Sequence, residues 1–520
     1  HDVRGRGMSP QEMILLAMLL ALIIGIVSGI PAMLAIAGVP LVTAFVAGQF
    51  GYFNLSFLSL YPARVWGVMT NTLLMAVPLF VLMGVLLERS RLAERMLHIL
   101  ANMLGGSPRG IALSVLLFST IIAASTGIIG ATVVMLVLIS LKPMMDAGVH
   151  PRQASGLICA AGTLGQIIPP SIVLVLLGDQ IGNTYLDAQQ RAGNFAPQPV
   201  SVADVFAGAL VPGLLLVGLY ALWLLITLRP ARGPVAAPKA EPVPLSEILV
   251  AFLPPLLLIL AVLGSILGGI ATATEAAGLG AVGALLMAAF AVTPRRHERV
   301  VIAIAGLAAF ALVMLRVAGM GRGAIDTPAG MFALAAAALI AIGVIAAAAR
   351  LWSHTMFQAA LLDTMRISGM VFGIVIAASM LALVFRGLGG DRTVSALMTG
   401  LPGGDAGVLL VVMAIVFLLG FILDAVEIIY IVVPLLGPAV LMGDVSPVWF
   451  AVLLAMNLQT SFLTPPFGFA IFYYRSVAPS SISTMEVYRG VLPFVGLQLL
   501  ALVLLITFPA LATWLPGRLF

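Results

Sequence analysis

Long hydrophobic windows dominate the chain. Apolar windows recur from Gln11 to the C-terminus, and a helix needs about 20 such residues to cross roughly 30 Å of hydrocarbon. The pattern predicts an all-α polytopic membrane protein with about twelve to fourteen spans. Residues 1–10 form a polar lead, or a cloning remnant over the first seven, and are excluded from the fold prediction.

Two of the windows are broken by a pair of prolines. The first carries Gly-Thr-Leu-Gly-Gln-Ile-Ile-Pro-Pro-Ser at residues 162–171, and the second carries Gln-Thr-Ser-Phe-Leu-Thr-Pro-Pro-Phe at residues 459–467. Proline removes an amide donor and clashes with the preceding helical turn. We therefore expect interrupted helices at about residues 153–177 and 448–475.

A long apolar stretch precedes each broken helix. Residues 111–141 are interrupted by Ala-Ser-Thr-Gly at 124–127, and residues 408–442 by Gly420 and by the segment from Asp424 to Glu427. Each half of about 15 residues is too short to cross comfortably, so both stretches are interpreted as re-entrant helical hairpins. Matching broken segments in two halves are typical of a transporter built from repeats.

The charges at the hairpin bases predict inverted repeats. The first base carries Arg109, Lys142, His150 and Arg152, whereas the second base has acidic residues only, Asp405 and Asp444. By the positive-inside rule, the first hairpin enters from the cytoplasm and the second from outside. Arginines near residues 89–95 and 294–299 agree with this orientation, as does an arginine-poor loop predicted at 178–204; Arg322 and Arg386 disagree with it.

The predicted domain organisation follows from these elements. A proline-rich, basic cytoplasmic linker at 229–247 separates a first half, residues 11–228, from the remainder. Residues 248–366 are expected to form scaffold and extra helices, and residues 367–520 the second half.

Composition excludes several function classes. The 520 residues are 62% hydrophobic and 9% charged, with a mean hydropathy of +1.18. The net charge of +5 comes from arginines in short loops, so it does not indicate nucleic-acid binding. The two lysines, Lys142 and Lys239, stand in no Walker A motif. The single Cys159 excludes internal disulfides and a thiolate cluster, and the histidines lie at loops or span ends, so we predict no enzyme activity.

Polar side chains gather beside the two breaks. Carbonyls freed by the prolines are oxygen ligands for an alkali cation, and the N-termini of half-helices suit an anion. These features predict two cation sites around one cavity for a polar solute. The alternative is that the hydroxyls only satisfy the carbonyls of kinked helices. The polar residues are Thr163, Gln166 and Ser171 in the first break and Gln459, Thr460, Ser461 and Thr464 in the second.

Three carboxylates lie in apolar surroundings. Asp424 and Glu427 are three residues apart, so both face one side of a helical arm. They are expected to bind a cation, carry a proton, or face a wet vestibule. Glu275, flanked by small residues, is either a structural hydrogen-bond partner or part of the transport path.

Four motifs together resemble the large membrane subunit of tripartite ATP-independent periplasmic (TRAP) transporters over about residues 11–510. They are Ala-Ser-Thr-Gly at 124–127, Gly-Gln-Ile-Ile-Pro-Pro-Ser at 165–171, Thr-Ala-Thr-Glu-Ala-Ala at 272–277, and the segment 457–468 with its Thr-Pro-Pro-Phe-Gly. The resemblance implies a sodium-driven elevator importer of a small organic acid in the bacterial inner membrane. It also implies a soluble periplasmic binding protein and a small four-helix membrane subunit as partners, and no cofactor besides Na⁺ as the coupling ion.

The resemblance also implies site residues. The first sodium site would use Ser125 and Thr126 with backbone near Gly165 and Ile168, and the second would use the region from Gly420 to Asp424 with Thr460 and Thr464. Substrate would lie between the hairpin tips and the breaks. Its expected contacts are Ser125, Thr126, Gly127, Thr163, Gln166, Pro169, Pro170, Ser171, Thr464, Pro465, Pro466 and Gly468.

The chain departs from this family pattern in two places. Ala425 follows Asp424 where many members have proline, and two extra apolar segments occur at 300–317 and 329–349. Both features resemble the longer branch labelled mannitol or chloroaromatic compound transporters, although 2-oxo acids and other carboxylates remain open as substrates. A stand-alone sodium- or proton-coupled carboxylate carrier and a membrane scaffold without transport are the alternative functions.

Overall fold

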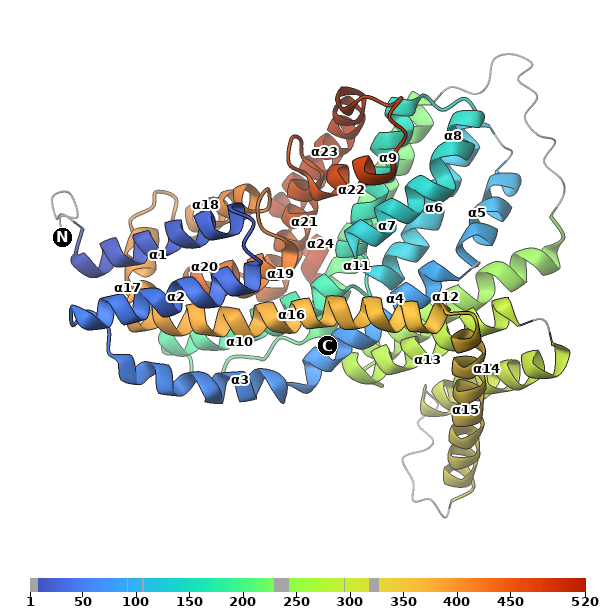
Figure 1. Cartoon of the computed structure of the whole chain (residues 1–520), viewed down its shortest axis with the longest axis horizontal. Helices are drawn as coiled ribbons and strands as arrows, with labels where there is room; N and C mark the ends of the chain where they lie inside the picture. The colour runs from blue at the N-terminus through green and yellow to red at the C-terminus, as the bar shows by residue number, and fades with distance from the viewer. Residues whose placement is uncertain (1–7, 91, 105–106, 229–242, 294, 318–326) are drawn as a thin grey trace. The chain divides into compact units, whose positions relative to one another are not determined.

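The structure is a computed structural model of the whole chain (Figure 1). It describes residues 8–90, 92–104, 107–228, 243–293, 295–317 and 327–520, apart from the side chains of residues 125, 126, 317 and 399. The polar lead before Met8, most of the predicted linker and Arg322 lie outside the described residues. The described residues form helices and connecting turns, without a strand among them, and eleven helices there are long and apolar enough to cross a membrane.

The described chain divides into two compact units. The first unit contains His1–Leu74, Leu176–Ser201 and Ile367–Phe450, and the second contains Met75–Val175, Val202–Arg366 and Ala451–Phe520. The units are not the two halves of the sequence. The first hairpin belongs to the second unit and the second hairpin belongs to the first unit.

The first unit is built from three separate stretches of the chain. Its elements are α1 (Pro10–Val27), α2 (Ala32–Gln49), η1 (Leu55–Leu60), α3 (Tyr61–Met69), most of α10 (Ile172–Arg191) and of α16 (Met356–Gly387), α17 (Gly390–Thr399), α18 (Gly404–Leu419), α19 (Ala425–Glu427), η5 (Ile428–Val432) and α20 (Val433–Leu441). Helices α1 and α2 pack as an antiparallel pair (Figure 1). Helices α18 and α20 contact each other and form the second predicted hairpin, with a tip between Leu419 and Ala425.

Helix α10 corrects one sequence-based expectation. The sequence predicts a loop over residues 178–204, but α10 is helical to Arg191 and only residues 192–201 are non-helical. The prediction is wrong for residues 178–191 because polar residues such as Asp179 and Gln180 lower the hydropathy of a segment that is nevertheless helical. Its polar positions are paired within the first unit rather than left in solvent.

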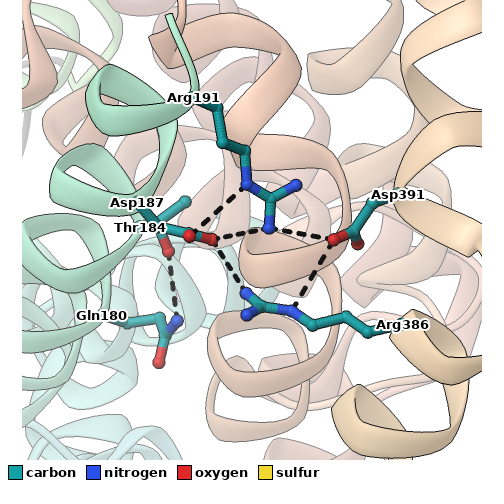
Figure 2. A network of polar contacts seen from close by, with 6 residues as sticks. All are labelled: Gln180, Thr184, Asp187, Arg191, Arg386 and Asp391. Carbon is teal, nitrogen blue, oxygen red and sulfur yellow. Dashed lines mark hydrogen bonds and ion pairs between the residues drawn. The ribbon is translucent and has the colours of Figure 1, made fainter. Parts of the chain in front are cut away.

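Four charged side chains close a ring at the end of α10 (Figure 2). Asp187 Oδ2 lies 2.9 Å from both Arg191 Nη2 and Arg386 Nη2, and Arg191 Nη2 lies 2.9 Å from Asp391 Oδ2. The ring is completed by Arg386 Nε and Asp391 Oδ2, 3.8 Å apart. One helix turn away, Gln180 donates to the Thr184 hydroxyl (Figure 2). Two positive and two negative charges therefore neutralise one another, and Arg386, which disagreed with the orientation rule, is ion-paired on both sides.

The second unit holds the remaining helices. They are α4 (Ala76–Arg89), α5 (Leu92–Met103), α6 (Pro108–Thr126), α7 (Ile129–Leu136), the π-helical turn η3 (Val137–Leu141), α8 (Lys142–Asp146), α9 (Pro151–Thr163), η4 (Leu164–Gln166), α11 (Val202–Thr227), α12 (Leu245–Leu267), α13 (Ala273–Val292), α14 (Arg296–Val317), α15 (Pro328–Ser353), most of α21 (Pro447–Leu463), α22 (Phe469–Val477), α23 (Thr484–Thr507), α24 (Ala510–Thr513) and α25 (Pro516–Leu519). The two extra apolar segments form α14 and α15, which pack against each other and against α13 (Figure 1).

The first hairpin consists of α6 and the continuous arm α7–η3–α8. Its arms have 19 and 18 residues, more than the 15 or so expected, which corresponds to about 27 Å of helix each. Arm length therefore does not distinguish a re-entrant hairpin from two spans, and re-entry stays a prediction. Both arms contact α9, so the hairpin is packed against the first broken helix.

Helices α9 and α23 approach each other at glycine. A methyl group added at Gly490 would lie 2.1 Å from the carbonyl oxygen of Arg152, and one added at Gly156 would lie 2.1 Å from the carbonyl oxygen of Gly490. Only hydrogen side chains allow this separation, which is the usual way for membrane helices to gain contact area.

This contact predicts the effect of Gly490→Ala. The added methyl must displace backbone, so we expect a loss of roughly 1–3 kcal/mol of stability despite the better helix propensity of alanine. The matched control is Gly496→Ala in the same helix, where no atom lies within 4 Å of the added methyl. Thermal unfolding midpoints in detergent should fall for Gly490→Ala only; equal midpoints for both variants would contradict the packing.

Candidate functional site

The tip of the first hairpin lies directly against the first Pro-Pro break. Gly127 ends α6 in the left-handed region, with φ 61°. A methyl group at Gly165 would lie 3.3 Å from Cα of Gly127, and one at Gly127 would lie 3.0 Å from the amide nitrogen of Ile172. The structure thus brings together the predicted residues Gly127 and Gly165. The side chains of Ser125 and Thr126, in the last turn of α6, are not among those described.

The first break is fully buried. Helix α9 ends at Thr163, a short 3₁₀ turn follows to Gln166, and the chain resumes helix at Ile172 after the cis-linked Pro169 and Pro170. Ser171 donates to the carbonyl oxygen of Gln166 across the break, at 3.3 Å. The side-chain oxygen of Gln166 is buried and has no hydrogen-bond partner among the described residues. Ile168 is 5% exposed, so the backbone here is shielded from lipid.

The second break is more open than the first. Helix α21 ends at Leu463, and α22 begins after Gly468, with the cis-linked Pro465 and Pro466 between them. The amide of Gly468 donates to the carbonyl of Thr464 at 3.1 Å. Pro466 is exposed and Phe467 is 67% exposed. The two breaks therefore share a sequence pattern but differ in environment.

A buried polar cluster links α9, α11 and α23. Gln498 Nε2 donates to the Tyr220 hydroxyl at 2.8 Å and to the Thr163 hydroxyl at 3.3 Å, and all three side chains have 0% exposure. Gln459, also fully buried, approaches Tyr220. Neither amide atom of Gln459, nor the side-chain oxygen of Gln498, has a hydrogen-bond partner among the described residues. Such buried amide groups are costly unless something else satisfies them.

Gln498 and Tyr220 are absent from the residues that the sequence predicts for the site. Both lie in ordinary apolar spans far from the breaks in sequence. A glutamine in the middle of a hydrophobic helix was the available signal, because an amide in hydrocarbon requires a partner. Their proximity to Thr163 is a consequence of tertiary packing alone.

The hydroxyl groups of the breaks use their protons locally. Thr163 donates to the carbonyl of Ala160 at 2.8 Å, Thr460 to that of Met456 at 2.8 Å, and Thr464 to that of Thr460 at 2.7 Å. A hydroxyl that donates to its own helix still presents oxygen lone pairs. This arrangement agrees with a purely structural role and equally with oxygen ligands aimed at a cation.

The residues of the second predicted sodium site are divided between the units. Gly420 and Asp424 belong to the first unit, and Thr460 and Thr464 belong to the second, so this site stays a prediction. Asp424 caps the second arm of its hairpin: its carboxylate accepts from the amide of Glu427 at 2.9 Å, and Glu427 accepts from the amide of Asp424 at 3.2 Å.

Two further carboxylates have defined partners. Asp179, within the misassigned loop, accepts from Asn71 Nδ2 at 3.3 Å and from Asn183 Nδ2 at 3.4 Å in the first unit. Glu275 forms a capping box with Thr272 at the start of α13, which confirms the structural alternative for this residue. Asp179 is thus a partly buried carboxylate whose partners only the structure identifies.

Comparison with known proteins assigns the family. The family model described as tripartite ATP-independent periplasmic transporter, DctM component, matches residues 13–322 and 291–511. The chain belongs to this family. It is therefore a TRAP large permease, a multi-pass protein of the inner membrane and a transporter component rather than an enzyme, as the sequence predicted.

Individual relatives agree with the assignment. The chain is 28% identical over 446 residues to the C4-dicarboxylate TRAP transporter large permease protein DctM of Vibrio cholerae, covering 85% of each chain. It is 26% identical over 453 residues to the isethionate TRAP transporter permease protein DctMQ of Oleidesulfovibrio alaskensis, covering 85% of this chain and 58% of that one. The crystal structure of the YdaH transporter of Alcanivorax borkumensis, described as having an unusual topology, shares the fold with a TM-score of 0.51, 15% identity, and coverage of 88% and 90%.

The buried cluster predicts strong coupling between Gln498 and Tyr220. Gln498→Leu removes the group that donates to the buried Tyr220 hydroxyl and leaves this hydroxyl unpaired. We expect the free energy of unfolding to fall by about 1–3 kcal/mol. Adding Tyr220→Phe removes the stranded group, so the double variant should be less destabilised than the sum of the two single changes by about 1 kcal/mol. Unfolding of all four proteins in one detergent measures this difference. Strict additivity would show that the 2.8 Å contact contributes nothing.

Proposed function

We propose that this TRAP large permease imports a small organic acid by coupling it to an inward sodium gradient. The observation that carries the proposal is the joint between Gly127 at the first hairpin tip and Gly165 beside the Pro-Pro break, where a methyl group added at Gly165 would lie 3.3 Å from Cα of Gly127. Interrupted backbone inside a membrane protein is tolerated where it lines a cavity or binds an ion. The buried, unpartnered oxygen of Gln166 stands at this joint.

Sodium would act at the first joint as a cross-link between the hairpin and the broken helix. Backbone carbonyls near Gly165 and Ile168, with the hydroxyls of Ser125 and Thr126, form the proposed ligand set. Oxygen ligands suit a hard cation, and an ion that binds both segments stabilises the arrangement in which they touch. A second ion would bind near Asp424, Gly420, Thr460 and Thr464.

The substrate carboxylate would bind between the breaks. Helices α10 and α22 begin at Ile172 and Phe469, directly after the two Pro-Pro pairs. Helix N-termini present free amides and a favourable dipole to an anion. Hydroxyl and amide groups of Ser171, Thr464 and Gln459 supply further polar contacts. The curated relatives transport C4-dicarboxylates and isethionate, by their names, so a small organic anion is the proposed substrate class.

The proposed transport cycle is an elevator. The two hairpins and the two broken helices would move together as one transport domain, while the remaining helices stay fixed. The proposed partners are a periplasmic binding protein, which delivers substrate, and a small four-helix membrane subunit. The tripartite description of the family supports both partners.

The decisive experiment is uptake into proteoliposomes that contain the chain and its small subunit. A binding protein loaded with labelled organic acid is added with and without an inward sodium gradient. We expect uptake only when the gradient and the binding protein are both present. Uptake without the binding protein would favour a stand-alone carrier, and uptake without sodium would favour proton coupling through Asp424 and Glu427.

Thr464→Val tests the second ion site. Valine matches threonine in shape but lacks the ligand oxygen, so we expect the sodium concentration for half-maximal uptake to rise about tenfold. Thr507→Val is the matched control, because its hydroxyl also donates to the carbonyl four residues earlier, at 2.8 Å. Unchanged sodium activation in Thr464→Val would remove Thr464 from the ion site without affecting the first joint.

A further inference from the structure

A cavity in the second unit lies at the end of α9 that is away from the first Pro-Pro break. Its volume is about 470 Å³, and its walls come from the start of α9, the end of α11 and the start of α23. Helices α11 and α23 are apolar enough to span a membrane. A cavity between the ends of spanning helices therefore lies near the level where hydrocarbon meets lipid head groups.

Part of the lining of this cavity is cationic. Arg152 and Arg489 contribute to it beside His150, and all three side chains are exposed. Arg152 Nε donates to the carbonyl of Arg489 at 3.1 Å, which holds the two residues together and leaves the other guanidinium nitrogens of Arg152 free of that bond. Among the described residues, neither arginine forms an ion pair with a carboxylate.

Glu486 does not line this cavity. It caps α23, where its carboxylate accepts from the Ser483 amide at 2.9 Å and from the Ser483 hydroxyl at 3.0 Å. The cavity of about 390 Å³ in the first unit has a different lining, because it contains the ion pair of Arg191 with Asp391 beside Arg392. The second-unit cavity is lined by two arginines and by no carboxylate.

The rest of the lining is mainly apolar and aromatic. It includes Trp223, Leu224 and Phe494, together with Thr227. Adjacent positions on the same helices point outward as large apolar side chains: Ile226 is 66% exposed and Leu492 is 55% exposed. An aromatic residue beside exposed aliphatic residues is typical of the membrane interface. A ligand here would meet both arginine side chains and apolar side chains of the lining.

We propose that this cavity binds the phosphate head group of an anionic phospholipid of the cytoplasmic leaflet. Arg152 and Arg489 would bind the phosphate oxygens, and Trp223 would lie beside the start of the acyl chains. Basic pockets between spanning helices on the cytoplasmic side suit such head groups, and guanidinium groups match phosphate geometry. The predicted orientation places this end in the cytoplasm, because it adjoins the basic base of the first hairpin.

The apolar residues of the lining favour a lipid over free phosphate. Inorganic phosphate would use the arginines only and would gain nothing from Trp223 or from the exposed aliphatic positions next to it. A phospholipid would contact the arginines with its phosphate and the apolar residues with its acyl chains. A bound lipid would also lie beside the contact between α23 and α9, because Gly490 lines the cavity and its backbone lies against that of α9.

Native mass spectrometry of the purified, delipidated chain tests the proposal. The protein is titrated with phosphatidylglycerol, with phosphatidylcholine of the same acyl chains, and with inorganic phosphate. We expect a saturable phosphatidylglycerol adduct and weaker phosphatidylcholine binding. Arg489→Gln should weaken phosphatidylglycerol binding about fivefold, and Arg489→Lys should retain part of it, because the charge remains without the planar fork.

Arg518→Gln is the matched control. Arg518 is an exposed arginine at the end of α25 and does not line the cavity, so its loss should leave the titration unchanged. A second readout is the thermal midpoint, which phosphatidylglycerol should raise in the unaltered chain and in Arg518→Gln but not in Arg489→Gln. The proposal would be overturned if the two lipids bound equally well, or if Arg489→Gln and Arg518→Gln lost the same amount of phosphatidylglycerol binding. Saturable binding of phosphate without a preference for either lipid would also overturn it.

Discussion

Backbone hydrogen bonding is the constraint on which this protein depends. Within hydrocarbon, each unpaired amide or carbonyl costs several kcal/mol, so a membrane protein can interrupt a helix only where something else satisfies the freed groups. This chain interrupts two helices, each with a pair of prolines. The first break is enclosed by the hairpin tip at Gly127 and by the polar cluster around Gln498. Protein contacts replace the lipid that the break could not tolerate.

The same constraint explains where the charges lie. Carboxylates at the starts of helices accept hydrogen bonds from backbone amides. Glu275 accepts from the amide of Thr272, and Asp424 and Glu427 each accept from the amide of the other. The ring formed by two arginines and two aspartates at the end of α10 removes four charges from the electrostatic balance of the first unit. Other polar groups are left without a partner by the described residues. They are the buried amide atoms of Gln166 and Gln459 and the arginines near Trp223 that form no ion pair.

Small side chains allow the broken elements to touch. Contacts at Gly127, Gly165, Gly156 and Gly490 bring backbone against backbone in the second unit. Packing this close leaves little room for one of these segments to shift without its neighbour, because packed interfaces switch between discrete arrangements rather than deform continuously. The proposed ion joint and the basic cavity lie at opposite ends of α9. Helix α9 is thus shared by both.

The membrane class, the two pairs of hairpin arms, the two broken helices and the family resemblance could all be predicted from the sequence. These features are written in local terms: apolar length, and prolines that cannot donate an amide hydrogen bond. The loop prediction failed for residues 178–191, because polar residues that are paired in the folded protein give a helix the low hydropathy of a loop. The packing of the helices brings Gln498 and Tyr220 to Thr163, Gly127 to Gly165, and Arg152 and Arg489 to one cavity. Contacts between residues hundreds of positions apart depend on how helices pack, and local sequence carries no record of that packing.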